Sequence, residues 1–197
     1  MSALLAALLG YLLGSVPFGL VIVKAAGLGD IRAIGSGNIG ATNVLRTGRK
    51  DLAFATLLLD SGKGAIAVII AHALSWRPEI AGAAAFLGHC YPVWLKFRGG
   101  KGYATFIGTL FAMHFPAGLF TGAIWLGVAY IFRFSSLAAL VSASATPLLL
   151  FAMGLPTYAA AAGFMTMLIY VRHITNIRRL LKNEEPKIGA KKKDAVT

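Results

Sequence analysis

The amino-acid sequence predicts an all-α integral membrane protein with seven transmembrane helices, its N-terminus outside the cell and its C-terminus in the cytoplasm. Hydrophobic residues make up 57% of the 197 residues and charged residues only 13%, about half the roughly 25% that is usual in soluble proteins. The charged residues occur in clusters, and three long stretches contain none: Ser2–Val23, Gly102–Phe132 and Phe134–Val171. Uncharged apolar stretches of about 18 residues or more are long enough to span a bilayer. This composition excludes a water-soluble globular domain and a collagen-like fibre.

The first three helices follow from apolar stretches in the N-terminal half of the chain. We expect them over residues 3–23, 52–74 and 80–95, the first ending at Lys24. No basic residue precedes the first stretch and no clear cleavage site follows it, so we interpret it as a permanent helix and not as a signal peptide.

The two later uncharged stretches each require a choice between one crossing and two. Gly102–Phe132 would be roughly 46 Å long as a single helix, against a hydrocarbon core of about 30 Å. His114–Pro116 offers a break in its middle, because proline interrupts a helix. Phe134–Val171 is longer still, and a break at Gly154–Pro156 would divide it into two crossings.

The distribution of basic residues decides the number of crossings. Of the 19 lysines and arginines, 17 fall into four groups between the apolar stretches. The groups are Lys24, Arg32, Arg46, Arg49 and Lys50; Lys96, Arg98 and Lys101; Arg133; and eight residues from Arg172 to Lys193. Cytoplasmic loops are enriched in such residues, and placing all four groups there requires an even number of crossings between each pair. Each long stretch then forms two helices, which gives seven in total.

The same distribution accounts for the net charge of +12 without a nucleic-acid partner, because a nucleic-acid-binding domain gathers its basic residues on one folded face. We expect one membrane domain over residues 1–185 and a basic, disordered cytoplasmic tail over residues 186–197. The single cysteine, Cys90, excludes an internal disulfide and a cysteine metal site. We expect no metal and no cofactor, and a monomer is compatible with the sequence.

The first cytoplasmic connection is rich in glycine and small polar residues. Its candidate phosphate-binding residues are Gly35, Ser36, Gly37, Asn38, Gly40, Thr42, Asn43 and Arg46. The glycines match the dinucleotide pattern G-x-G-x-x-G, but a transmembrane helix precedes them where that pattern requires a strand. Consecutive backbone N–H groups can still cradle an anion, and an arginine can bind phosphate through two hydrogen bonds. The alternative is a glycine-rich turn without a ligand.

The second connection contains Gly99, Gly100, Lys101 and Gly102. Exposed glycine amides and one ammonium group suit a phosphate, although Leu95 and Tyr103 exclude a Walker A loop. A flexible positively charged loop is the alternative. We include His89 in this phosphate-binding set, although a histidine within a helix is more often a hydrogen-bonded structural residue.

The third connection follows the last helix. On a helix His173, Asn176 and Leu180 share one face, because they are three and seven residues apart. This spacing would direct an imidazole and a carboxamide to the same place at the membrane surface. The alternative is a polar helix end whose arginines extend their charged groups toward water.

Asp60 and Lys63 lie three residues apart within the second predicted helix. Ionisable residues inside a membrane are costly and are usually paired or functional. We interpret these two as a structural pair that neutralises itself.

These motifs together resemble the PlsY family of bacterial acyl-phosphate:glycerol-3-phosphate acyltransferases. The resemblance runs in order from about residue 10 to residue 187 and includes five segments. They are Gly14–Gly19, the Gly35–Asn43 loop with Arg46, Asp60–Gly64, His89–Thr105 and His173–Glu185. The family's seven-helix topology agrees with the number of crossings obtained from charge.

The resemblance implies transfer of a fatty acyl group from acyl phosphate to the first hydroxyl of sn-glycerol 3-phosphate. The products are lysophosphatidic acid and phosphate, made at the cytoplasmic side of the bacterial inner membrane as the first acylation of phospholipid synthesis. It implies catalytic roles for Ser36, Lys101, His173 and Asn176 and a structural role for Glu185. The glycines at 99, 100 and 102 belong to the loop that holds glycerol phosphate, and the first connection holds a phosphate.

Two residues depart from the family pattern, Tyr103 at a small aliphatic position and Asn183 at a glycine position. Neither is one of the polar groups proposed for catalysis. The main alternative function is a small transporter of organic phosphates. Such a protein would be expected to show paired repeats and polar groups near the midplane, where only Asp60 and Lys63 are charged.

Overall fold

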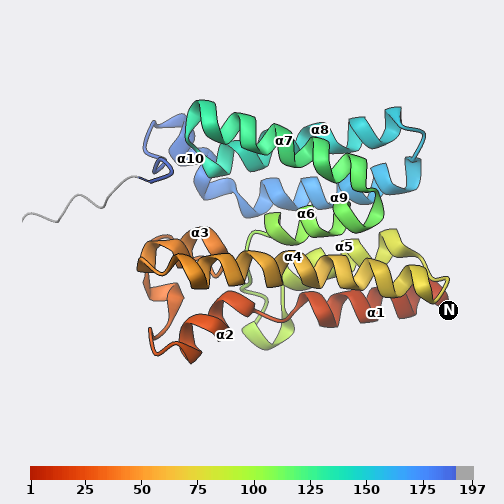
Figure 1. Cartoon of the computed structure of the whole chain (residues 1–197), viewed down its shortest axis with the longest axis horizontal. Coiled ribbons are helices and arrows are strands. Elements are labelled where there is room, and N and C mark those ends of the chain that lie inside the picture. The colour runs from red at the N-terminus through yellow and green to blue at the C-terminus, as the bar shows by residue number, and fades with distance from the viewer. Residues whose placement is uncertain (190–197) are drawn as a thin grey trace, which may run out of the picture.

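The computed structural model describes residues 1–189, and the described chain is helical without any strand. The longer helices run along the long axis of the molecule and pack side by side (Figure 1). The described helices of eight residues or more are α1 (Ser2–Gly14), α2 (Phe18–Ala25), α4 (Lys50–Ala73), α5 (Pro78–Cys90), α6 (Tyr103–Met113), α7 (Phe115–Phe132), α8 (Ser135–Ala152), α9 (Pro156–Arg172) and α10 (Ile174–Leu181). Short helical turns connect them: η1 (Ile31–Ala33), α3 (Ala41–Val44), η2 (Leu45–Thr47) and η3 (Val93–Leu95).

The breaks predicted in the two long uncharged stretches are both present. His114 separates α6 from α7, and its Nδ1 accepts a hydrogen bond of 3.3 Å from the backbone N–H of Ala117. Gly154, with φ at +74°, ends the turn after α8, and α9 begins at Pro156. Each long stretch therefore forms two helices, as predicted.

The first predicted helix, residues 3–23, is divided in the structure. α1 ends at Gly14 and α2 begins at Phe18, because Pro17 cannot donate the backbone hydrogen bond that a continuous helix needs. The carbonyl of Ser15 accepts 2.8 Å from Nε1 of Trp94. The carbonyl of Val16 accepts 2.8 Å from Nζ of Lys63. These distant side chains satisfy backbone groups that a bilayer would otherwise leave without partners.

The third predicted helix, residues 80–95, is shorter than expected. α5 ends at Cys90, and η3 follows after Pro92. Because α5 ends early, the chain of the second connection can turn back toward the C-terminal end of α5.

Four helical segments of the described chain are long and apolar enough to span a bilayer by length and composition. They are Ser2–Ala25, Lys50–Ala73, Phe115–Phe132 and Ser135–Ala152. The other bundle helices α5, α6 and α9 have 13, 11 and 17 residues. The fold is thus that of an all-helical integral membrane protein.

Small residues allow the closest helix contacts. A Cβ atom at Gly14 would lie 1.9 Å from the carbonyl oxygen of Ala85, so α1 packs directly against the backbone of α5. A Cβ at Gly108 of α6 would similarly lie 2.0 Å from the carbonyl oxygen of Ser61 in α4. Such contacts are typical of helices that associate within a membrane.

Asp60 and Lys63 form an ion pair of 2.8 Å with side chains only 3% exposed. His89 of α5 lies beside them, its Nδ1 being 3.6 Å from Oδ1 of Asp60. Lys63 also donates to the break between α1 and α2. The cluster therefore connects α4, α5 and that break.

Candidate active site

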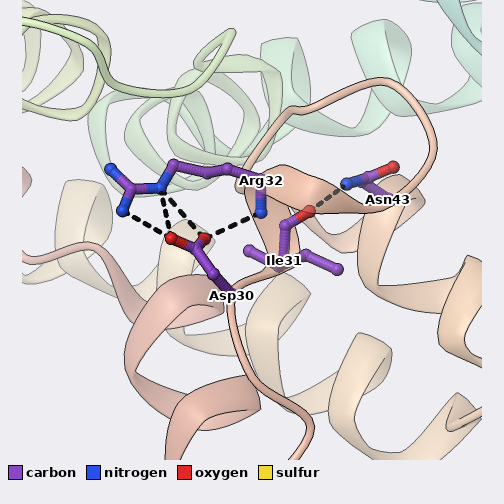
Figure 2. A network of polar contacts seen from close by, with 4 residues as sticks. All are labelled: Asp30, Ile31, Arg32 and Asn43. Carbon is purple, nitrogen blue, oxygen red and sulfur yellow. Dashed lines mark hydrogen bonds and ion pairs between the residues drawn. The ribbon is translucent and has the colours of Figure 1, made fainter.

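The first connection is organised by the buried side chain of Asn43. Its Nδ2 donates to the carbonyls of Ile31 (3.0 Å), Ile34 (2.9 Å) and Asn38 (2.8 Å). Its Oδ1 accepts from the backbone N–H of Ser36 at 3.0 Å and from the Ser36 hydroxyl at 3.3 Å. Figure 2 shows the contact with Ile31. Asn43, predicted to bind phosphate, therefore acts on the loop itself and holds Ser36 in place.

An ion pair fixes the entry to this loop. The Asp30 carboxylate accepts from the backbone N–H of Arg32 at 2.9 Å and from its guanidinium at 2.6–3.0 Å (Figure 2). These hydrogen bonds lower the pKa of Asp30 to about 2. Both residues are exposed, so the pair shapes the chain without contributing much stability.

Gly35 lets Arg46 fold back over the loop. Its φ is +57°, a conformation that favours glycine, and a Cβ there would lie 2.8 Å from Nη1 of Arg46. Arg46 and Ser36 are both exposed. Their polar groups are thus available to a ligand on the outside of the loop.

The second connection folds back onto the end of α5. The N–H groups of Gly99 and Gly100 donate to the carbonyls of Cys90 (3.1 Å) and His89 (3.0 Å). A Cβ at Gly100 would lie 2.1 Å from Nε2 of His89. The two glycines therefore permit close backbone packing, and their amides, which we expected to face a phosphate, already have partners.

Lys101 extends from this loop to the third connection. Its Nζ donates to Oδ1 of Asn176, and Nδ2 of Asn176 donates 2.6 Å to Oε1 of Glu185. The same carboxylate accepts from the hydroxyl of Ser136 and from Nε of Arg179, both at 2.7 Å. The structure thus brings together an ammonium group, a carboxamide and a carboxylate from segments about 80 residues apart in sequence.

The surroundings of Lys101 disfavour its charge. Burial lowers the pKa of Lys101 to about 8, the negative charge of Glu185 opposes that shift, and three nearby guanidinium groups add to it. These belong to Arg179, Arg46 and Arg172. Arg46, from the first connection, is therefore close enough to act on Lys101. A concentration of positive charge of this kind attracts an anionic ligand.

Glu185 stays ionised within this cluster. Burial raises the pKa of its carboxyl, but hydrogen bonds from Ser136, Asn176 and Arg179 outweigh burial and lower it overall. The carboxylate therefore holds Asn176 in the orientation that presents its oxygen to Lys101.

His173 is neutral at physiological pH. Burial, followed by the positive charge of Lys101, lowers its pKa to about 4. Its Nδ1 lies 2.8 Å from the carbonyl oxygen of Ile169. Since a carbonyl can only accept, we assign the proton to Nδ1, which leaves Nε2 as the acceptor nitrogen.

The predicted site residues lie in three places in the structure. Lys101, His173 and Asn176 lie together, with Arg46 within electrostatic range. His89 is only 4% exposed and lies beneath the second connection. The candidates Gly35, Ser36, Gly37, Asn38, Gly40, Thr42 and Asn43 form the separate first loop.

Three residues that sequence reasoning did not select complete the site: Arg172, Ser136 and Arg179. Ser136 and Arg179 bind Glu185, and Arg172 binds the carbonyls of the second connection. The sequence marks Arg172 and Arg179 only as positive charges of a predicted cytoplasmic connection. Their proximity to His173 and Asn176 in sequence was the one available signal.

Comparison with known proteins identifies the family. Residues 4–183 match the family described as glycerol-3-phosphate acyltransferase. The Maricaulis maris glycerol-3-phosphate acyltransferase is 60% identical over 194 residues, covering 98% of this chain and 90% of the relative. That of Rhodospirillum rubrum is 58% identical over 199 residues, covering 96% and 92%.

Two solved structures of PlsY (YgiH), an integral membrane glycerol 3-phosphate acyltransferase, share the fold. The glycerol 3-phosphate form has a TM-score of 0.90 at 41% identity, and the lysophosphatidic acid form 0.88 at 40%, each over 96% of both chains. These similarities confirm the resemblance seen in the motifs. The chain belongs to the glycerol-3-phosphate acyltransferase family.

Proposed function

We propose that this protein transfers a fatty acyl group from acyl phosphate to the first hydroxyl of sn-glycerol 3-phosphate, releasing lysophosphatidic acid and inorganic phosphate. The observation that carries the proposal is the contact between Lys101 and Asn176 beside a neutral His173. Family membership supports the acceptor, and the related PlsY structures are of a glycerol 3-phosphate form and a lysophosphatidic acid form.

The acyl phosphate donor suits a site built from positive charge and hydrogen-bond donors. An acyl phosphate is an activated mixed anhydride whose leaving group is phosphate, so positioning and charge stabilisation can supply most of the catalysis. The two substrates repel each other because both carry negatively charged phosphate. The positive charges of Lys101 and Arg46 would offset these negative charges and reduce the repulsion. The described residues hold no cluster of histidine, cysteine and acidic groups suited to a metal, and the proposed reaction requires no cofactor.

In the proposed reaction the acceptor oxygen forms a bond to the acyl carbon, and the bond from that carbon to the phosphate oxygen breaks. The phosphate leaves with the bonding electron pair. The hydroxyl proton passes to a base, for which Nε2 of His173, the Ser36 hydroxyl and a substrate phosphate are the candidates. Asn176 orients the Lys101 ammonium by accepting its hydrogen bond, and Glu185 holds the Asn176 carboxamide in place.

The first connection would hold one of the two phosphates. Its Ser36 hydroxyl and Arg46 guanidinium are exposed on the loop that Asn43 organises. The glycines, Asn38 and Thr42 would contribute backbone and side-chain groups to the same phosphate. Gly99, Gly100 and Gly102 would instead shape the loop that presents Lys101.

We also propose that the chain crosses the bacterial inner membrane seven times, with the site on the cytoplasmic side. The crossings are α1 with α2, α4, α5, α6, α7, α8 and α9. The N-terminus lies at the end of the molecule opposite α10, which agrees with an odd number of crossings (Figure 1). Arg133 exchanges backbone and side-chain hydrogen bonds with Ile188, so basic connections far apart in sequence meet at one end.

The test is a reaction of the purified protein with glycerol 3-phosphate and each of two donors of equal chain length, an acyl phosphate and an acyl thioester. We expect lysophosphatidic acid and one equivalent of phosphate from the acyl phosphate alone. Product from the thioester alone would contradict the proposed donor. Uptake of glycerol 3-phosphate into liposomes without any product would instead support the transporter alternative.

A further inference from the structure

Arg172, the last residue of α9, binds the second connection through its guanidinium fork. Its Nε donates 2.9 Å to the carbonyl of Gly100, and its Nη2 donates 2.6 Å to the carbonyl of Gly99. Two parallel donors on a rigid plane fix both the distance and the direction of the group they bind. These two carbonyls immediately precede Lys101 in the chain.

The guanidinium also contacts an aromatic ring. Its central carbon lies 5.2 Å from the centroid of the Tyr91 ring, which is a cation–π contact. The backbone carbonyl of Tyr91 accepts 2.8 Å from the hydroxyl of Tyr11 in α1. Arg172 therefore contacts both an anchored aromatic ring and the carbonyls of the loop.

The amides of the loop are bound by the end of α5. The N–H groups of Gly99 and Gly100 donate to the carbonyls of Cys90 and His89, and the His89 ring lies against Gly100. The amides of the loop are thus bound by the end of α5, and its carbonyls are bound by Arg172. Arg172 is the member of this arrangement that comes from α9, the helix leading into His173.

We infer that Arg172 is a positioning residue for Lys101: by binding the carbonyls of Gly99 and Gly100, it keeps the Lys101 ammonium at the place where Asn176 and His173 meet. The inference rests on the proposed function of Lys101 as a phosphate-neutralising group. It also relates the two halves of the site, because the residue that orients Lys101 directly precedes His173 in sequence.

A lysine in place of Arg172 separates this role from a purely electrostatic one. Arg172→Lys keeps the positive charge, and with it any effect on membrane topology, but it cannot reproduce the planar fork. Arg172→Gln removes both charge and fork. Arg178, six residues further and exposed, provides matched controls in Arg178→Lys and Arg178→Gln.

The experiment measures KM and kcat for both substrates with purified wild-type protein and the four variants, together with their thermal unfolding in detergent. For Arg172→Lys we expect kcat/KM for glycerol 3-phosphate to fall about tenfold, the cost of losing a well-aligned charged hydrogen bond. The fall should be larger for Arg172→Gln. KM for acyl phosphate should stay within about twofold, and both Arg178 variants should match the wild type.

Other results would overturn the inference in distinct ways. Wild-type kinetics in Arg172→Lys would show that only the charge matters. An equal change in the KM values for glycerol 3-phosphate and for acyl phosphate would assign Arg172 to general stability. Loss of folded protein in both Arg172 variants would do the same. An inactive wild-type protein with acyl phosphate would instead contradict the proposed function.

Discussion

Burial gives Lys101 and His173 different protonation states at neutral pH. The same desolvation that lowers the pKa of Lys101 to about 8 also lowers that of His173 to about 4. At neutral pH the site therefore combines a cationic Lys101 with an uncharged imidazole. The sequence predicted that His173 and Asn176 share a face of one helix; in the structure His173 is the N-cap of α10, which contains Asn176, and both side chains are buried. It could not predict that Lys101 contacts Asn176, because that contact spans 75 residues.

Replacing Lys101 tests whether its charge serves the substrate. We expect Lys101→Ala to lower kcat/KM by about 100-fold or more while leaving a folded membrane protein, since removing one group that stabilises charge in a desolvated site has an effect of this size. Lys187→Ala removes the same charge from an exposed position and should keep near-wild-type activity. Equal activity of both variants would make Lys101 only a topological charge.

The pH dependence of kcat/KM should report the same group. Lys101 is protonated below its pKa of about 8 and neutral above it, so activity should decrease as the pH rises through about 8. His173 loses its proton near pH 4 and cannot cause this decrease. Lys101→Arg keeps a positive charge at every accessible pH, so any activity that it retains should lack the decrease. An unchanged alkaline profile in Lys101→Arg would assign the titration to another group.

At the scale of helices, proline and glycine mark the ends well, and tertiary contacts are what they do not show. The breaks at His114 and Gly154 follow from local sequence. The break between α1 and α2 was missed, although Pro17 is a local signal for it. What the local sequence could not show is that Lys63 and Trp94, from 47 and 79 residues away, bind the carbonyls that the break leaves free. A pattern of apolar residues contains no information about such donors.

Close packing between α1 and α5 can be tested with one glycine. Gly14→Val would place side-chain atoms where the Ala85 carbonyl oxygen lies, 1.9 Å from a Cβ at that position. We expect the free energy of unfolding to fall by about 2 kcal/mol or more, because an overfilled contact forces backbone shifts. Gly122→Val in α7 is the control, since a Cβ there meets nothing within 4 Å. Thermal unfolding in detergent measures both, and equal stability would contradict the packing described.

At the scale of the whole molecule, the distribution of charge predicts that the four basic connections lie on one side of the membrane. The structure joins three of the four basic groups to one another through Lys101 with Asn176 and Arg133 with Ile188. The predicted basic tail continues beyond these contacts, and residues 190–197 lie outside the described chain. Apolar length alone could not have grouped the connections, because α5, α6 and α9 are each shorter than the roughly 20 residues of a full transmembrane helix.

The orientation in the membrane can be measured by cysteine labelling of intact cells in a Cys90→Ala background. Lys50→Cys and Lys187→Cys are exposed positions on basic connections, and both should be protected from an impermeant thiol reagent until the cells are opened. Ser75→Cys, exposed between α4 and α5 at the other end of α4, should react in intact cells. Because Lys50 and Ser75 flank a single helix, opposite accessibilities would establish that α4 crosses the bilayer.

Because α5 to α9 lie between Ser75 and Lys187, opposite accessibilities of these two positions require an odd number of crossings over those five helices. Labelling of Lys50→Cys and Lys187→Cys from outside, with Ser75→Cys protected, would invert the topology and place the Lys101 site on the face where cytoplasmic acyl phosphate cannot reach it.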